Sequence, residues 1–404
     1  MKKVYFAVII AALGYFVDIY DLILFSIVRV PSLKAIGLSD ADITSKGLLI
    51  LNLQMAGMLI GGVFFGVLGD RKGRLSVLFG SIFLYSIANI LNGFVQTYEQ
   101  YAILRFIAGI GLAGELGAGI TLVAEMIPKD KRGYGTTIVS AVGVSGALLA
   151  WYMANEFDWR TAYFFGGGMG LALLFLRVGV LESGLFENLK KSHGVASRGD
   201  FLSLFTNRSR LRRFVNGIAI GAPLWYVVGI LITLSPEFFK ALGGTEIIEA
   251  GRCVFFSYAG LVVGDIMAGI LSQIFKSRRK VIFGFLLATT VSILAYFSLR
   301  ELTANQFYTL TFFMGICVGF WVLFVTVSAE QFGTNLRATV ATSTPNFVRG
   351  SLVVISLIFS ALKPSFGILN AGLITGVITM VFSFVGLYYI DETFHKDLDF
   401  VEKD

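Results

Sequence analysis

Two carboxylates lie close together in the stretch GYFVDIYDLILF, residues 14–25, within a long apolar run. Asp18 and Asp21 are separated only by Ile19 and Tyr20. A charged group at the centre of a bilayer costs about 2.5–3.5 kcal/mol on insertion scales, so paired acids in such a run indicate a function. Residues three apart share one face of a helix, and we therefore expect both side chains on one wall.

Proton carriage is the chemistry that fits these two acids. A carboxylate whose arginine partner is alternately bound and released can take up and lose a proton. Arg105 and Glu115 supply charges of both signs in a later apolar run. The alternatives are purely structural roles for the three acids, and for Arg105 an extended side chain that reaches the lipid headgroups.

The second half of the chain holds two further intramembrane charges, Asp265 and Arg349. If they pair, they hold two helices together. If they do not, the planar guanidinium of Arg349 suits a carboxylate or phosphate of a substrate. Four residues at similar depth are candidates for lining a substrate cavity, with ordinary packing as the alternative: Trp225, Tyr226, Trp321 and Asn346. Arg29, near the end of the first apolar run, is expected at the membrane interface.

Composition places these residues in a membrane protein. Of the 404 residues, 56% are hydrophobic and only 15% are charged, against roughly 25% charged in globular chains. The net charge of +7 comes from basic residues in short gaps between apolar runs, which disfavours a nucleic-acid partner. Cys253 and Cys317 are isolated and no zinc-ligand spacing occurs, so neither a metal nor a cofactor is expected. No nucleophile–base pair supports a membrane-embedded enzyme.

The apolar runs predict an all-α membrane protein with twelve transmembrane helices. About 20 apolar residues cross a bilayer, and such runs must be helical to satisfy their backbone groups. The predicted spans are 5–30, 46–68, 75–95, 101–126, 134–154, 161–179, 213–235, 251–275, 281–299, 307–330, 339–361 and 368–390. With the N-terminus inside, 22 Lys and Arg residues lie on the inner side and seven on the outer side. This bias predicts that both termini are cytoplasmic.

Two six-helix halves are predicted on either side of a polar segment. We expect an N-terminal bundle over 1–180, a cytoplasmic linker over 181–212, a C-terminal bundle over 213–390 and a tail over 391–404. Ala124-Glu125 and Arg132 recur as Ala329-Glu330 and Arg337, each 205 positions later. A repeat of this kind indicates a duplicated six-helix unit, as in one large class of transporters.

The stretch GVLGDRKGR, residues 66–74, resembles the loop signature of the major facilitator superfamily, with Leu75 where a basic residue is usual. Within that superfamily, FVDIYDLILFS, RFIAGIGLAGELGAG with AEMIP, DWRTAY and LESGLFENLK are similar to metabolite:proton symporters, sialic-acid transporters and related sugar porters. AVGVSGALLAW, residues 141–151, lacks the proline that is typical of drug:proton antiporters. The resemblance implies the major facilitator fold.

The resemblance also implies roles for particular residues. Asp21 and Arg105 would form a proton-coupling pair, and Glu115 would carry protons or contact substrate. Charges at the ends of the helices would form an ionic latch on the cytoplasmic side. These gate candidates are Asp70, Arg71, Arg74, Glu125, Arg132, Glu182, Glu330 and Arg337.

Together these features predict a secondary transporter of the inner (plasma) membrane that works by alternating access. We expect proton-coupled uptake of a small polar metabolite, an organic anion, with Asp21 and either Asp18 or Glu115 as proton sites and Arg349 and Asp265 near the substrate. The expected partners are the substrate, protons and the lipid bilayer, and the expected state is a monomer. A proton-driven exporter and an uncoupled facilitator remain the alternatives.

Overall fold

A computed structural model describes residues 2–72, 74–115, 132–182 and 201–394. Every regular element in these ranges is helical. The N-terminal half comprises α1 (Lys2–Ala35), α2 (Asp40–Lys72), α3 (Arg74–Asn92), α4 (Tyr98–Leu112), α6 (Arg132–Val144), α7 (Gly146–Glu156) and α8 (Trp159–Glu182). The C-terminal half comprises α10 (Ser203–Thr206), α11 (Arg208–Tyr226), the π-helix η1 (Val227–Ile232), α12 (Ser235–Ala241), α13 (Ala250–Ile274), α14 (Arg278–Ser298), α15 (Ala304–Val318), α16 (Trp321–Glu330) and α17 (Thr334–Tyr388).

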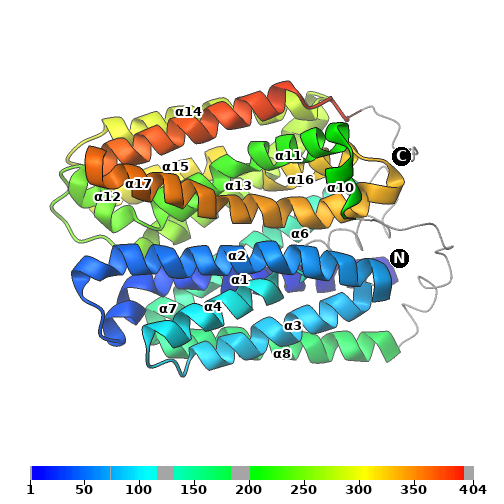
Figure 1. Cartoon of the computed structure of the whole chain (residues 1–404), viewed down its shortest axis with the longest axis horizontal. Helices are drawn as coiled ribbons and strands as arrows, with labels where there is room; N and C mark the ends of the chain where they lie inside the picture. Colours follow the sequence, from blue (N-terminus) through cyan, green and yellow to red (C-terminus); the bar gives the residue numbers. More distant parts are fainter. Residues whose placement is uncertain (1, 73, 116–131, 183–200, 395–404) are drawn as a thin grey trace.

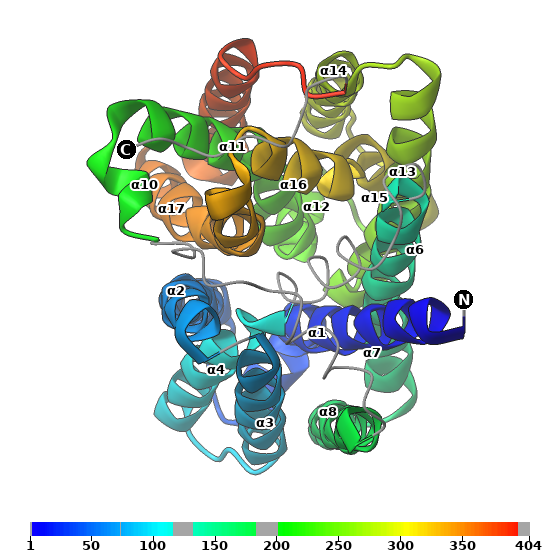
Figure 2. The same ribbon diagram turned by 90° about the vertical axis from the view of Figure 1, so that its right-hand side faces the viewer.

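The two halves lie side by side with their long helices roughly parallel to one axis (Figure 1). Both chain ends lie at the same end of the bundle, which we call the terminal face. The other end, the loop face, carries the connections at 36–39, 93–97, 157–158, 242–249 and 299–303. Figure 2, viewed from the terminal face, shows α1 and α2 of one half turned toward α17 and α13 of the other.

The helices follow from the apolar runs of the sequence. Among the described residues, eight helices are long and apolar enough to cross a membrane. Large apolar side chains such as Phe175 and Phe313 are well exposed on the outside of the bundle, at 74% and 56%. Such a surface suits lipid rather than water. Each predicted span is helical over most of its described residues, but the count of twelve stays a prediction.

The same glycine packing recurs in both halves. Gly57 and Gly61 of α2 lie against α4, where an added Cβ would come within 2.2 and 2.3 Å of the Phe106 and Ile110 carbonyl oxygens. In α13, a Cβ on Gly260 or Gly264 would approach the corresponding carbonyls of α15 to 2.0 and 2.3 Å. Small residues four apart let helix backbones approach closely in membranes. This parallel supports the internal repeat predicted from the sequence.

Breaks in two helices of the C-terminal half position its candidate site residues. The π-helix η1 begins directly after Trp225 and Tyr226 at the end of α11. A second break at Gly319 and Phe320 separates α15 from α16, so that Trp321 stands at the first position of α16. Irregular helical backbone in a membrane protein is tolerated where it is buried or lines a cavity, and π-bulges are frequent at functional sites.

Gly367 divides α17 into two helices. Its φ of +71° lies in the left-handed region that favours glycine. The chain reverses direction near this position and returns along the bundle (Figure 1). The segment before the break, on which Arg349 lies, packs against α2 and α11.

Candidate functional site

Helix α1 carries both of the paired acids, Asp18 and Asp21. Asp18 and Asp21 are both fully buried. Gly14 lies four residues before Asp18, so helical geometry puts it on the same face. Arg29 lies further along α1, about 22 Å from Gly14 at 1.5 Å per residue. Each of these four positions meets a different charged partner, buried in three cases and partly exposed at Glu237, so α1 is the axis of the site.

Asp21 is held by an arginine of its own half. Arg105 Nη1 donates to Asp21 Oδ1 at 2.9 Å and to Asn89 Oδ1 at 3.1 Å. Arg105 Nη2 donates to the Asp21 carbonyl at 3.1 Å, and Nε donates to Gln54 Oε1 at 3.4 Å. Its guanidinium also lies 5.5 Å from the centre of the Tyr163 ring. Arg105 is therefore buried and does not extend to lipid headgroups.

Glu115 pairs with an arginine that the sequence analysis did not select. Arg177 of α8 donates through Nη1 to Glu115 Oε2 at 3.0 Å and through Nη2 to Oε1. Both side chains are nearly fully buried. Gly14 leaves the room for this fork, because an added Cβ would stand 2.0 Å from Glu115 Oε1. The missed signal was the position of Arg177 inside the predicted span 161–179, where an intramembrane charge indicates function.

Arg349 pairs with Asp18 across the two halves. Its Nη2 donates to Asp18 Oδ2 at 3.1 Å, and both side chains are fully buried. The possible pair between Asp265 and Arg349 is not formed. Asp265 instead accepts from Ser140 Oγ of α6 at 2.8 Å and from the Val322 amide at 3.4 Å.

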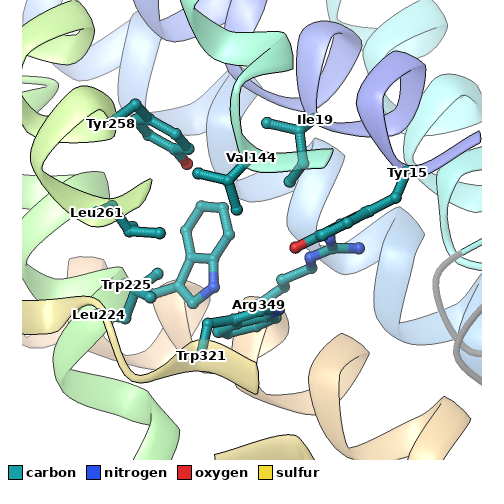
Figure 3. A pocket seen from close by; sticks show the side chains of 9 residues that line it. All are labelled: Tyr15, Ile19, Val144, Leu224, Trp225, Tyr258, Leu261, Trp321 and Arg349. Atoms are coloured by element: carbon teal, nitrogen blue, oxygen red, sulfur yellow. The ribbon is translucent and has the colours of Figure 1, made fainter. Parts of the chain in front are cut away.

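A small cavity lies beside Arg349, with a volume of about 20 Å³ open to the centre of a water molecule. That is room for one or two waters. The side chains of Trp225, Trp321 and Arg349 converge on it, as Figure 3 shows. Its other lining residues are Tyr15, Ile19, Val144, Leu224, Tyr258 and Leu261.

Three predicted substrate contacts are not among the residues that line this cavity. The Tyr226 hydroxyl donates to the Gly372 carbonyl at 2.6 Å, within the C-terminal half. Asn346 Nδ2 donates to the Ala113 carbonyl at 2.8 Å and so bridges the halves. Asp265 bridges them as well, through Ser140. Buried polar groups need such partners, and these three find theirs in helix contacts.

Comparison with known proteins places the chain in a family. Residues 5–356 match the sequence profile of the Major Facilitator Superfamily. The chain belongs to this superfamily. It is 28% identical to a protein of Cupriavidus pinatubonensis described as a probable 4-methylmuconolactone transporter, covering 94% of this chain and 89% of that one. It is 27% identical to a gentisate transporter of Corynebacterium glutamicum, with 82% and 75% covered. It is 31% identical to a sialic acid transporter of Escherichia coli, with 43% of each chain covered.

The predicted relationship to metabolite transporters, the sialic-acid branch included, is therefore confirmed. Membership of the superfamily makes this chain a multi-pass membrane protein and a transporter rather than an enzyme. The buried acids and arginines of α1, α4, α8 and α17 are then charges inside a transport bundle. Intramembrane charges of this kind commonly mark substrate or proton pathways.

Contacts of Arg29 and Thr44 with Glu237, which we call the latch, join the two halves at the loop face and were not predicted from the sequence. Arg29 Nη2 donates to Glu237 Oε1 at 2.8 Å and to the Thr233 carbonyl at 3.1 Å. The Thr44 hydroxyl donates to the same Glu237 oxygen at 3.0 Å. Arg29 is fully buried, so its predicted place at the membrane interface is wrong. Arg29 is paired with Glu237 of the other half. The two residues lie far apart in the sequence, so the sequence did not reveal this partner.

The predicted gate of the terminal face is only partly described. Glu330 pairs with Arg278, and Arg337 donates through Nε and Nη2 to the Phe332 carbonyl at 3.2 and 3.0 Å. Glu125 lies outside the described residues. The side chains of Asp70, Arg71, Arg74, Arg132 and Glu182 also lie outside them, on backbone that is helical. The ionic latch on this face stays a prediction.

Proposed function

We propose that this protein takes up an organic anion together with protons across the inner (plasma) membrane. Its fold would be twelve transmembrane helices in two pseudo-symmetric halves, with both termini and the terminal face cytoplasmic. The halves would rock about a central site, as in other transporters built from repeats. We expect it to act as a monomer.

The observation that carries this proposal is the set of three buried carboxylate–arginine pairs, one of which includes Arg349 of the cavity wall. Asp18, Asp21 and Glu115 each meet an arginine within the buried interior. A buried carboxylate can exchange a proton when its cationic partner moves, because the partner favours the ionised form. We assign proton coupling to Asp21 with Arg105, assisted by Asp18 or Glu115.

The cavity favours an anion with a flat frame. Arg349 offers a planar fork of donors that suits a carboxylate. Its guanidinium lies 5.8 Å from the centre of the Trp321 ring, and the Trp225 indole borders the same space. Gentisate and sialic acid, named for two of the relatives, are carboxylates, and gentisate is aromatic. We infer a small carboxylate, aromatic or unsaturated, as the substrate class.

The latch on the loop face supports alternating access. Arg29 and Thr44 belong to one half and Glu237 to the other, so their contacts bind the halves together at that end. The small cavity leaves no room for a substrate of ten or more atoms. Binding therefore requires the halves to move apart on one side.

The test is transport by the purified chain in proteoliposomes, with labelled gentisate and competing carboxylates. An inward proton gradient should drive accumulation above equilibrium, and a protonophore should abolish it. Equilibration that ignores the gradient would establish a facilitator instead, and accumulation driven only by an opposed gradient would establish an exporter.

Asp21→Asn gives the residue-level test of coupling. A neutral amide can occupy the site but carries no proton, so we expect the variant to lose accumulation while retaining exchange of labelled for unlabelled substrate. Asp265→Asn is the matched control, because Asp265 is an equally buried acid bonded to a serine. Wild-type accumulation by Asp21→Asn would remove Asp21 from the mechanism.

A further inference from the structure

One of the three buried carboxylate–arginine pairs differs from the others in where its partners lie. Asp21 with Arg105 and Glu115 with Arg177 are each formed within the N-terminal half. Asp18 lies in α1 and Arg349 in α17, 331 positions away. If the halves move as rigid bodies, a pair inside one half is carried along unchanged. The Asp18–Arg349 pair spans the moving interface and must break or rearrange.

Arg349 is also incompletely used. Only its Nη2 reaches Asp18, at 3.1 Å, in a single contact rather than a fork. Its Nε and Nη1 have no hydrogen-bond partner among the residues that the structure describes, and neither has Asp18 Oδ1. Buried donors without acceptors destabilise a fold. A guanidinium with free donors beside a cavity is a site for a second oxyanion.

A further free donor of the cavity points to the same ligand chemistry. Trp225 Nε1 is buried and has no acceptor within the described ranges. Figure 3 shows the Arg349 guanidinium, the Tyr15 hydroxyl and the two indoles turned toward one space. An anion on a flat frame would find hydrogen-bond donors at its carboxylate and apolar rings along its faces.

We propose that Asp18 and the substrate carboxylate take turns on Arg349, so that this one guanidinium couples proton binding to substrate binding. A proton from the aqueous phase forms an O–H bond on Asp18, which releases Arg349. The substrate carboxylate then takes the place of Asp18 on the guanidinium, and no covalent bond of the substrate changes. The inference rests on the proposed function, which names Asp18 among the acids that assist Asp21, and it assigns to Asp18 the step that links proton binding to substrate binding.

The charges around Asp18 fit such an exchange. Facing it are Arg349 on α17, Glu115 after α4, Asp21 and Tyr15 on α1, Tyr85 on α3 and Tyr258 on α13. Arg349 is the arginine in contact with Asp18, whereas Glu115 and Asp21 hold arginines of their own. An anion that entered without a proton would leave Arg349 with two competing carboxylates. An anion that enters with one proton keeps the net charge of the buried site constant.

The exchange sets a quantitative linkage between ligand and proton. Where Asp18 is ionised in the free protein, one proton must be bound for each anion bound. The affinity for the anion should then fall about tenfold for each unit rise in pH, because coupling between two ligands is reciprocal. Once Asp18 is neutral, the affinity should no longer depend on pH.

The test uses the purified full-length chain and benzoate, a carboxylate on an unsubstituted benzene ring. Isothermal titration between pH 6 and 9, in buffers of different ionisation enthalpy, counts the protons taken up for each benzoate. The wild type should take up one at pH values where Asp18 is ionised in the free protein, and fewer as the pH falls and Asp18 becomes neutral. Asp18→Asn should bind benzoate more tightly at high pH, take up none and show no pH dependence. Asp265→Asn is the control and should retain the uptake, because Asp265 is bonded to Ser140 and not to Arg349. Asp21→Asn and Glu115→Gln test the two rival acids.

Several outcomes would overturn the exchange. These are an unchanged proton uptake in Asp18→Asn, no uptake in the wild type, or no benzoate binding by Asp18→Asn at millimolar concentrations. Arg349→Lys keeps a charge without the fork and should lower the affinity at least tenfold. If Asp18→Asn does not fold, the number of protons taken up by the wild type and by the variants of Asp21, Glu115 and Asp265 decides. Loss of uptake in one of these variants would assign the exchange to that acid.

A measurement without ligand provides a second reading. In a chain that keeps only Trp321 of its four tryptophans, fluorescence should change with pH as Asp18 releases the guanidinium near that ring. A response that persists in Asp18→Asn would contradict the exchange. Failure of gradient-driven accumulation would remove the proposed function and leave these binding results standing. An absent linkage would remove the exchange and leave coupling at Asp21 open.

Discussion

Gly14 shows how a residue without a side chain serves the charged centre. It lies on the face of α1 that carries Asp18, and the Glu115–Arg177 fork fills the space where its side chain would be. A Cβ there would meet Glu115 Oε1 at 2.0 Å and Arg177 Nη2 at 2.3 Å. Both are ends of side chains, but each is held by the other in a buried pair. The contact therefore cannot relax without loosening the fork.

Gly14→Ala should therefore lower the free energy of unfolding by about 1–3 kcal/mol, the usual cost of overpacking. The measurement is the thermal melting temperature in detergent. Gly168→Ala on α8 is the matched control, because a Cβ there meets no atom within 4 Å and alanine favours helix. Equal melting temperatures for the two variants would contradict the close contact.

Single residues also mark how far sequence reasoning reached. The pairing of Asp21 with Arg105 was expected from a family resemblance, and the structure brings the two together at 2.9 Å. The partner of Asp18 lies 331 positions away, and no spacing rule connects α1 with α17. Arg29 was misplaced for a related reason, since an arginine near the end of an apolar run resembles an interfacial one until its acid is known.

At the scale of elements, periodic and compositional signals sufficed for the long helices and failed at their interruptions. The predicted span 5–30 falls within α1, and 251–275 matches α13 to within one residue at each end. The π-helix η1 and the break at Gly319 left no signal in an apolar run, because hydropathy does not report which hydrogen-bond register the backbone adopts. Those interruptions place Trp225 and Trp321, which were predicted with Arg349 as substrate contacts, whereas the other residues that line the cavity were not predicted.

The latch on the loop face joins elements of both halves and yields its own prediction. Glu237→Gln should weaken the hold on Arg29, because a neutral amide cannot balance a buried charge. The halves should then part more often at that end. In a chain without native cysteines, Ile27→Cys in α1 should react several-fold faster with a maleimide when Glu237→Gln is added.

Thr44→Ala is the control for that experiment. It removes one neutral hydrogen bond to the same carboxylate and leaves the ion pair, so its effect on labelling should be smaller. If Thr44→Ala matched Glu237→Gln, the charge of Glu237 would not be what closes the loop face.

At the scale of the whole molecule, polar contacts join the halves at several depths. They run from Arg29 and Glu237 at the loop face through Asn52 and Ser356, which meet at 2.7 Å, to Asp18 and Arg349. Within each half, glycines let the backbones of neighbouring helices pack directly against one another. The interface between the halves is instead formed by side chains. Side-chain contacts can be exchanged at low cost, so movement should concentrate at the interface.

A disulfide across that interface tests whether the halves must separate at the loop face. A Cβ on Gly251 of α13 would lie 2.9 Å from Ile27 Cγ2 of α1, within reach of disulfide geometry. In a Cys253→Ala, Cys317→Ala background, Ile27→Cys with Gly251→Cys should lose transport on oxidation and recover it on reduction.

Gly217→Cys with Ser328→Cys is the matched control within one half, where the added Cβ stands 3.2 Å from that of Ser328. Oxidation of the control should leave transport intact, because rigid halves do not change internally. Transport at an undiminished rate through the cross-linked interface would exclude rocking halves, whatever the substrate is.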